Sequence, residues 1–272
     1  MDIAYLGPPG TFTEQAVLAY LAGQPAQLYP HHSIQGTLRA VDQGKVDYAV
    51  VPVENSVEGS VGLTLDVMWN LVNLTVQAAI ELPIAQALLS FSPEMSRITR
   101  VYSHAQALAQ CQGWLELNLP LAQQIPSAST SEASQYLAQD YNYAAIASPR
   151  AAHLQNIPIL QTAIQDYPDN RTRFWIVNRT LPNLVGERLS LAFSPRRRGP
   201  GVLMEALSLF AQRGINLTRI ESRPSKKLMG EYVFFIDAEG KIPLVQEALA
   251  QLSPLTEGLR LLGCYQIRHV QG

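Results

Sequence analysis

The stretch "DIAYLGPPGTFTEQAVLAYL", residues 2–21, joins a short apolar run to a helical segment through a loop rich in glycine and proline. Residues 2–6 predict a strand, and residues 13–21 predict the helix that follows it. Thr11 and Glu14 fit the S/T-x-x-E capping box, and Ser129 with Glu132 repeats it. A helix start carries unpaired N–H groups and a partial positive charge, which bind carboxylate or phosphate groups. Taken alone, the loop is equally compatible with a plain turn.

Strands and helices continue to alternate as far as about residue 181. Further strands are predicted at residues 46–53, 98–104, 142–148 and 173–178, and helices at residues 63–72 and 105–117. In the second of these helices, Leu108, Cys111 and Leu115 share one side. The alternation predicts parallel α/β architecture, and we expect residues 1–181 to form one α/β unit of two lobes.

The loops between these elements are rich in Thr, Ser, Asn and Gln. In open α/β sheets a ligand lies at the carboxyl ends of the strands, where such loops gather. The polar loops therefore predict a ligand cleft, and they are "GPPGTF" (7–12), "PVENS" (52–56), "YSHAQ" (102–106), "PSASTSE" (126–132) and "DNRTRF" (169–174).

The chain after residue 187 has a different pattern. Strands at residues 188–194, 215–224, 230–238 and 259–267 and helices at residues 200–214 and 242–252 give the order βαββαβ. Each helix has an apolar stripe that can cover one face of an antiparallel sheet, which is the ferredoxin-like arrangement. One stripe is Val202, Leu203, Ala206, Leu207 and Phe210, and the other is Leu244, Val245, Ala248, Leu249 and Leu252.

Composition excludes several classes of protein. Hydrophobic residues make up 47% of the 272-residue chain and charged residues 15%, with a net charge of -2, so nucleic acid is not an expected partner. No apolar run is long enough for a membrane span, and the N-terminus lacks a signal-peptide pattern, so we expect a cytoplasmic protein that does not bind membranes. The two cysteines and five histidines show no metal-ligand spacing, and neither nucleotide-binding glycine motif is present.

Five motifs of the first unit and two of the second carry a family resemblance. "GPPGTFTEQA", "VPVENSVEGSVG", "YSHAQALAQC", "STSEA" and "NRTRF", followed by "GVLMEALSLFAQRGINLTRIESRP" and "EYVFFIDAEG", resemble prephenate dehydratase with a C-terminal ACT regulatory domain. The motifs stand in family order over residues 3–267. The departures are Ala105, where the family has proline, and Val202, where it has alanine. The chain starts directly with the dehydratase motif, so we expect no chorismate mutase module.

The resemblance implies a fold and an activity. Residues 1–181 would form a catalytic domain of two α/β lobes, similar to a periplasmic binding protein, and residues 187–269 the ACT domain. The reaction would convert prephenate to phenylpyruvate, carbon dioxide and water. The catalytic residues carried over are Thr172, Asn55, Ser103 and Gln110, with Glu54 beside them, and the substrate-binding residues are Thr11, Phe12, Ser56, Ser129, Thr130, Arg171, Arg173 and Phe174.

The chemistry of prephenate suggests roles for these residues. Aromatisation drives the loss of the ring carboxylate and the ring hydroxyl, so no electron sink and no cofactor are expected. We expect Thr172 to donate a hydrogen bond to the departing hydroxyl, with Glu54, or a water held by Asn55 and Gln110, supplying the proton. The arginines would hold the pyruvyl carboxylate, and the ring carboxylate would face Phe174 or Phe12.

The resemblance also implies regulation. ACT modules pair between subunits and bind an amino acid at their interface, so L-phenylalanine is the expected feedback effector of a homodimer or homotetramer. The matching effector positions are Gly201, Val202 and Leu203 at a helix start and Asn216, Leu217 and Thr218 entering a strand. Glu221 is a candidate route between the regulatory and catalytic parts, or a residue that merely caps a strand.

Two other functions stay open on sequence grounds. Arogenate dehydratase would use the same residues on a substrate that has an amine in place of the ketone. A non-catalytic sensor of small ligands is the second alternative, because two-lobed folds also serve binding proteins.

Overall fold

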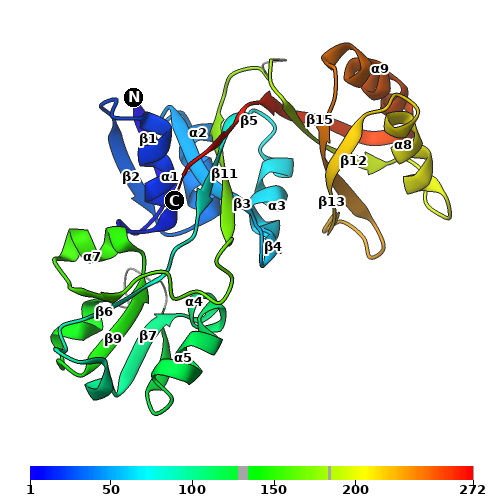
Figure 1. Ribbon diagram of the computed structural model, residues 1–272. Coiled ribbons are helices and arrows are strands. Elements are labelled where there is room, and N and C mark those ends of the chain that lie inside the picture. Colours follow the sequence, from blue (N-terminus) through cyan, green and yellow to red (C-terminus); the bar gives the residue numbers. More distant parts are fainter. Residues whose placement is uncertain (128–133, 183–184, 272) are drawn as a thin grey trace.

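The computed structural model describes residues 1–127, 134–182 and 185–271. The described strands form three sheets, one in each of two lobes and one in a domain that projects to the side (Figure 1). Three separate segments of the chain form the first lobe, because the second lobe and the side domain are both inserted between strands of its sheet.

The first lobe has a mixed sheet in the order β16-β5-β11-β3-β1-β2, with β4 paired to β3. Its strands are β1 (Asp2–Leu6), β2 (Gln27–His31), β3 (Tyr48–Asn55), β4 (Gly59–Ser60), β5 (Thr75–Pro83), β11 (Arg171–Asn178) and β16 (Ile267–His269). Strand β1 is parallel to β2 and β3, but β11 is antiparallel to both β3 and β5. The expectation of a parallel sheet is therefore wrong at its centre, because β11 returns from the second lobe and enters the sheet from the cleft side.

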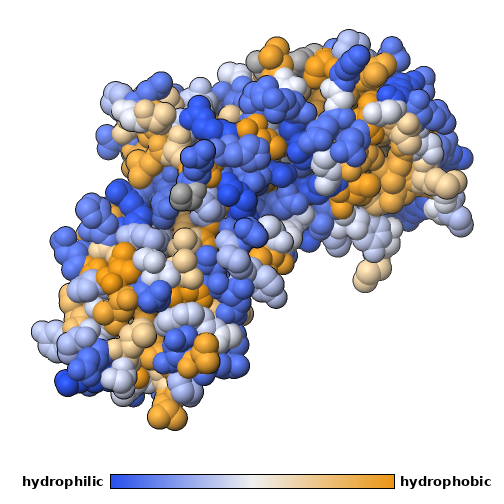
Figure 2. All heavy atoms as spheres, viewed as in Figure 1, coloured by the Kyte–Doolittle hydropathy of each residue, from blue (hydrophilic) through white to orange (hydrophobic). Residues whose placement is uncertain are grey.

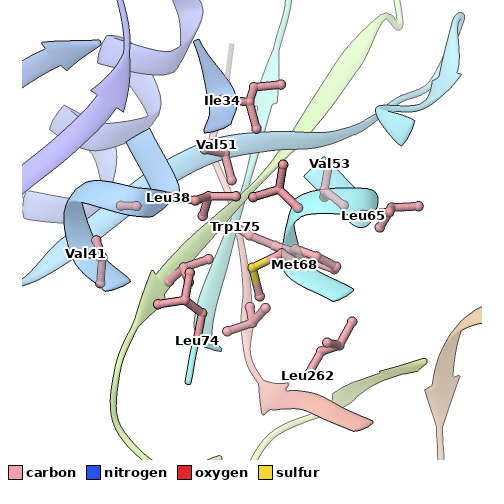
Figure 3. Close-up of a cluster of buried hydrophobic side chains, with 14 of the residues drawn as sticks. Ile34, Leu38, Val41, Val51, Val53, Leu65, Met68, Leu74, Trp175 and Leu262 are labelled. Carbon is pink, nitrogen blue, oxygen red and sulfur yellow. The ribbon is translucent and has the colours of Figure 1, made fainter. Parts of the chain in front are cut away.

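Helices pack on both faces of this sheet: α1 (Phe12–Leu21), α2 (Ile34–Asp42) and α3 (Gly62–Asn70). Val17 of α1 packs with Ile3 and Ile176 on one face. On the other face, Trp175 lies among Leu38 of α2, Met68 of α3 and Val51 of β3 (Figure 3). The alternation of strand side chains thus buries β11 on both faces and fixes its position in the sheet.

The second lobe has a sheet in the order β10-β6-β9-β7-β8. Its elements are β6 (Ala87–Ser90), β7 (Arg100–His104), α4 (Ala105–Gln110), α5 (Gln112–Asn118), β8 (Gln123–Ser127), β9 (Tyr143–Ala147), α7 (Pro149–Gln155) and β10 (Ile159–Gln161), with 3-10 turns at Met95–Arg97 and Ser134–Ala138. The helix predicted over 105–117 is interrupted at Cys111, whose ψ of 14° is not helical. Leu108, Cys111 and Leu115 nevertheless share one buried side, as predicted.

Two connections join the lobes, and they are hydrogen-bonded to each other. The first leads from β5 to β6 and the second from β10 to β11. Where they meet, the N–H of Ile84 donates to the carbonyl oxygen of Asn170 at 2.8 Å. This pairing places the ends of β5 and β11 side by side at the entrance to the second lobe.

The side domain has the predicted βαββαβ order. Its elements are β12 (Arg188–Pro195), α8 (Val202–Ala211), β13 (Asn216–Pro224), β14 (Tyr232–Glu239), α9 (Ile242–Leu252), a 3-10 turn at Ser253–Leu255 and β15 (Thr256–Tyr265). The antiparallel sheet has the order β13-β14-β12-β15, and α8 and α9 cover one face through Phe210, Val245 and Leu252. This arrangement is ferredoxin-like, and the prediction is confirmed.

The other face of the side domain packs on the first lobe. Phe235 and Leu262 belong to the same buried cluster as Trp175. At Gly263, an added Cβ would lie 2.3 Å from the carbonyl oxygen of Val76, so only glycine allows β15 to cross β5 this closely. The division of the chain at residues 181 and 187 stays a proposal, and β16, inside the expected range 187–269, belongs to the sheet of the first lobe.

Candidate active site

A cavity of about 430 Å³ lies between the two lobes. It falls within the size range of small-molecule sites. The first lobe contributes the ends of β1 and β3 and the starts of β11, α1 and α2, and the second lobe contributes the start of α4. The lining residues are Leu6, Gly7, Thr11, Phe12, Thr13, His32, Ile34, Pro52, Asn55, Val61, Ile84, Gln86, His104, Gln106, Ala107, Gln110, Thr172 and Phe174.

The loop before α1 is held by both lobes. Thr11 is the N-cap, and its Oγ1 accepts from the N–H of Glu14 at 3.3 Å, as the capping box predicts. The carboxylate of Glu14 reaches one residue further back, where it accepts from the N–H of Gly10 at 2.7 Å. From the second lobe, Arg150 pairs with Glu14 at 3.3 Å and the hydroxyl of Ser148 donates to the carbonyl of Gly10 at 2.6 Å. The start of α1 is therefore fixed at the mouth of the cleft.

A chain of buried amides links Thr172 to the second lobe. Nδ2 of Asn55 donates to Oγ1 of Thr172 at 2.9 Å and to Oδ1 of Asn170 at 2.7 Å. Nδ2 of Asn170 donates in turn to Oε1 of Gln110 at 3.1 Å, and Nε2 of Gln110 donates to Oε1 of Glu58 at 3.3 Å. Because Oγ1 of Thr172 accepts from Asn55, its own hydroxyl proton remains available to a ligand in the cavity.

Both the oxygen and the nitrogen of the Asn55 side-chain amide form hydrogen bonds with other groups of the protein. Its Oδ1 accepts from the N–H groups of Val57 and Glu58 at 3.0 and 2.9 Å, and its Nδ2 also reaches the carbonyl oxygen of Arg171 at 3.1 Å. The side chain is 7% exposed. Its geometry therefore suits holding Thr172 and the loop after β3 in place.

Several predicted site residues lie away from the cavity. Ser103 is fully buried and donates to the carbonyl oxygen of Ile146 at 2.6 Å. Oγ of Ser56 accepts from the N–H of Arg171 at 2.9 Å. Glu54 pairs with Arg173 at 2.8 Å. Ser129 and Thr130, with the capping box at Ser129 and Glu132, lie outside the described residues.

The two arginines of "NRTRF" point away from the cleft, which corrects the role expected for them. Arg171 binds Glu81 at 2.9 Å and the carbonyl oxygen of Val270 at 2.8 Å, and Arg173 binds Glu54. Successive side chains on a strand face opposite sides. Because Thr172 and Phe174 line the cavity, Arg171 and Arg173 necessarily lie on the other side of β11.

The described lining residues include no Asp, Glu, Lys or Arg. His32 and His104 are the lining side chains there that can serve as a general acid or base. Nδ1 of His104 accepts from the N–H of Gln106 at 3.3 Å, which leaves Nε2 to carry the proton of the neutral ring. Burial, and after it the charge of Glu14, raises the pKa of Tyr5 below the α1 loop to about 12, so this phenol is neutral at physiological pH.

Sequence reasoning missed Asn170, Gln86 and the two histidines of the lining. Asn170 and His104 stand inside the polar loops already noted, which is the signal that could have found them. Gln86 is 3% exposed, and its Oε1 has no hydrogen-bond partner among the described residues. Nothing in its local sequence marks it.

A smaller cavity of about 210 Å³ lies at the start of α8. Of the predicted effector residues, Val202 and Leu203 line it, and Gly201 is the N-cap of α8 with a φ of 83°. Asn216, Leu217 and Thr218 begin β13 and are not among its described lining residues. Asn216 instead donates to Glu239 at 3.3 Å, and Thr218 accepts from Arg188.

Comparison with known proteins gives consistent matches over nearly the whole chain. The family model for prephenate dehydratase matches residues 3–181, and the model for the ACT domain matches residues 198–254. A bifunctional chorismate mutase/prephenate dehydratase of Aquifex aeolicus is 42% identical over 97% of this chain and 73% of its own. A prephenate dehydratase of Lactococcus lactis is 39% identical over 98% of both chains. The crystal structure of prephenate dehydratase from Arthrobacter aurescens in complex with L-Phe has a TM-score of 0.88 and 38% identity, covering 98% of this chain and 90% of that one.

Among the helices of the described chain, none has the length and apolar character needed to cross a bilayer.

Proposed function

The chain belongs to the prephenate dehydratase family, and from this premise we propose that its cleft converts prephenate to phenylpyruvate, carbon dioxide and water. The observation that carries the proposal is the position of Thr172. Its hydroxyl lies at the cavity, accepts one hydrogen bond from Asn55, and keeps its own proton for a ligand. A positioned donor of this kind stabilises charge as it develops on a leaving oxygen.

We propose that the hydroxyl of Thr172 donates a hydrogen bond to the departing ring hydroxyl. A threonine hydroxyl is too weak an acid to transfer the proton unaided, so the proton needs another source. Glu54 is directed to Arg173 on the far side of the strand and does not fill this role. Of the described lining residues, His32 and His104 carry imidazole groups that can deliver a proton, directly or through a bound water.

Because Arg171 and Arg173 point away from the cavity, a carboxylate of the substrate needs another binding group there, and the N-termini of two helices provide one. The N-terminal turns of α1 and α2 line the cavity, and both present N–H groups and a positive partial charge. We propose that the pyruvyl carboxylate binds there. The ring carboxylate then faces Phe12 and Phe174, because an apolar wall favours the loss of its charge.

We propose L-phenylalanine as the feedback effector of the ACT domain. The resemblance to a dehydratase that was solved with L-Phe supports this, as does the cavity at the start of α8. That cavity combines Arg196, Arg197 and Arg198, which suit a carboxylate, with the apolar Val202 and Phe234, which suit a benzyl ring.

We also propose a homodimer or homotetramer that assembles through the ACT domain. Apolar side chains are exposed there at Met204, Ile220, Leu228, Met229 and Tyr232. Figure 2 shows hydrophobic residues gathered on the visible face of this domain. Sedimentation velocity tests this proposal, because a monomer at micromolar concentration would contradict it. The two buried free thiols, Cys111 and Cys264, fit the reducing cytoplasm that we propose as its compartment.

The activity is tested by incubating the purified protein with prephenate and following phenylpyruvate, with arogenate as the parallel substrate. We expect turnover of prephenate. Turnover of arogenate alone would transfer the assignment to arogenate dehydratase. Binding of both without turnover, unaffected by Thr172→Ala, would identify a ligand sensor.

A further inference from the structure

Arg173 connects the catalytic lobe to the ACT domain. Its Nη1 lies 2.8 Å from Oε2 of Glu54 and 3.5 Å from Oδ2 of Asp237, and its Nη2 lies 3.9 Å from Oε2 of Glu81. Glu54 and Glu81 belong to strands β3 and β5 of the first lobe, whereas Asp237 belongs to β14 of the ACT domain. One side chain on the strand of Thr172 therefore touches both units.

Asp237 is held firmly within its own domain. Its side chain is fully buried, and Arg219 donates to both of its carboxylate oxygens at 3.0 and 3.1 Å. The hydroxyl of Ser190 also donates to this carboxylate. Arg219 lies over the ring of Trp175, with its guanidinium carbon 5.5 Å from the ring centroid. Because these charges are out of water, loss of one partner perturbs the others more than it would at a surface.

The register of β3 and β11 places this ion pair directly behind the catalytic side chains. Thr172 is paired with Asn55, and Arg173 is paired with Glu54. The pair Thr172 and Asn55 meets the cavity, while Arg173 turns to the side on which the ACT domain lies. Arg173 and Thr172 are consecutive residues of β11, so a single peptide bond joins the residue that contacts the ACT domain to the residue at the cavity.

We propose that Asp237 is a positioning residue for the reaction. Its carboxylate holds Arg173, which in turn holds Glu54, and together they fix the strand ends that present Thr172 and Asn55 to the substrate. We place the point at which the ACT domain acts on the active site at Asp237, whereas the sequence offered Glu221 as a candidate route or as a residue that merely caps a strand. The inference rests on the proposed function for its kinetic consequences.

The test compares Asp237→Asn with Asp66→Asn. Asp66 of α3 also pairs with the ACT domain, through Arg223 at 3.0 Å and Lys226 at 2.7 Å, but it is not part of the β3 and β11 strand ends. We expect Asp237→Asn to lower kcat for prephenate by about fivefold or more, in the range of allosteric couplings, with KM little changed. Asp66→Asn should keep the wild-type kcat at temperatures where it is folded. Equal kcat losses in both variants, or a wild-type kcat in Asp237→Asn, would overturn the proposal.

A second variant covers the case in which Asp237→Asn fails to fold because Arg219 is left buried without a counterion. The double variant Asp237→Asn, Arg219→Gln removes both charges of that pair and leaves only Arg173 without its ACT partner. It should show the same loss of kcat.

Amide hydrogen exchange separates this inference from the proposed activity. Peptides covering residues 53–58 and 169–175 should exchange faster in the Asp237 variants and at the wild-type rate in Asp66→Asn. If the wild-type protein did not turn over prephenate, the proposed function would fail, and unchanged exchange in these peptides would independently reject the role of Asp237.

Discussion

Replacing Thr172 with valine removes the hydroxyl that we place against the leaving group and keeps a side chain of similar shape. The side chain is 8% exposed, and its oxygen accepts one hydrogen bond, from Nδ2 of Asn55. That donor retains two other acceptors, Oδ1 of Asn170 and the carbonyl oxygen of Arg171. Since no buried donor is orphaned, we expect the free energy of unfolding to fall by only about 1 kcal/mol.

The effect on catalysis should be much larger. A preorganised donor to a developing negative charge contributes about 3 to 4 kcal/mol, so kcat for prephenate should fall by about 10² to 10³. KM should change little, because the bond forms mainly in the transition state. Steady-state formation of phenylpyruvate gives both constants, and thermal unfolding measured in parallel shows whether the variant is folded.

Thr172→Ser is the matched control, because it keeps the hydroxyl and loses only a methyl group. We expect it to retain most of the wild-type kcat. If Thr172→Val kept kcat within about threefold, or if serine and valine were equally impaired, the hydroxyl would have no special part in the reaction.

Three further predictions concern other parts of the structure. Asn170→Ala leaves Oε1 of Gln110 without its donor and should lower the free energy of unfolding by about 1 to 3 kcal/mol in urea titrations; no loss would disprove the amide chain. Burial alone would raise the pKa of Asp66, but hydrogen bonds from Arg223 and Lys226 outweigh it and hold the pKa below 3.8. The stability that Asp66 confers is therefore present above that pH and lost as pH falls through the folded-state pKa, so wild type and Asp66→Asn should differ at pH 7 and converge in acid. Burial raises the pKa of the Cys111 thiol to about 12, so it should not react with a disulfide reagent at pH 8 until the protein is unfolded; rapid labelling of the native protein would contradict this.

The sequence patterns predicted the ACT fold well because the spacing of apolar residues marks the buried face of each of its helices and strands. The apolar stripe of residues 202–210 predicts the buried face of a helix, and the alternation of apolar and polar residues does the same for the strands. The first unit was harder to predict. Residues 171–178 look like any other buried strand, and only the return of the chain from the second lobe makes β11 antiparallel.

The sequence predicted many of the residues that line the cavity, but it did not predict the direction in which all of the expected side chains point. Thr172, Asn55, Gln110, Thr11, Phe12 and Phe174 do meet at one cavity. Successive side chains of β11 face opposite sides of the sheet, so Arg171 and Arg173 lie on the side away from the cavity. The role of Asp237 depends on its contact with Arg173, a residue far away in the sequence, which a single sequence does not reveal.

The most direct test of this account is a crystal structure of the Thr172→Val variant with prephenate bound. We predict the substrate in the cavity between the lobes, with its ring hydroxyl at residue 172 and a carboxylate at the start of α1 or α2. Arg171 and Arg173 should keep their pairs with Glu81 and Glu54. A substrate carboxylate bound directly to either arginine, or a substrate bound outside this cavity, would contradict the account.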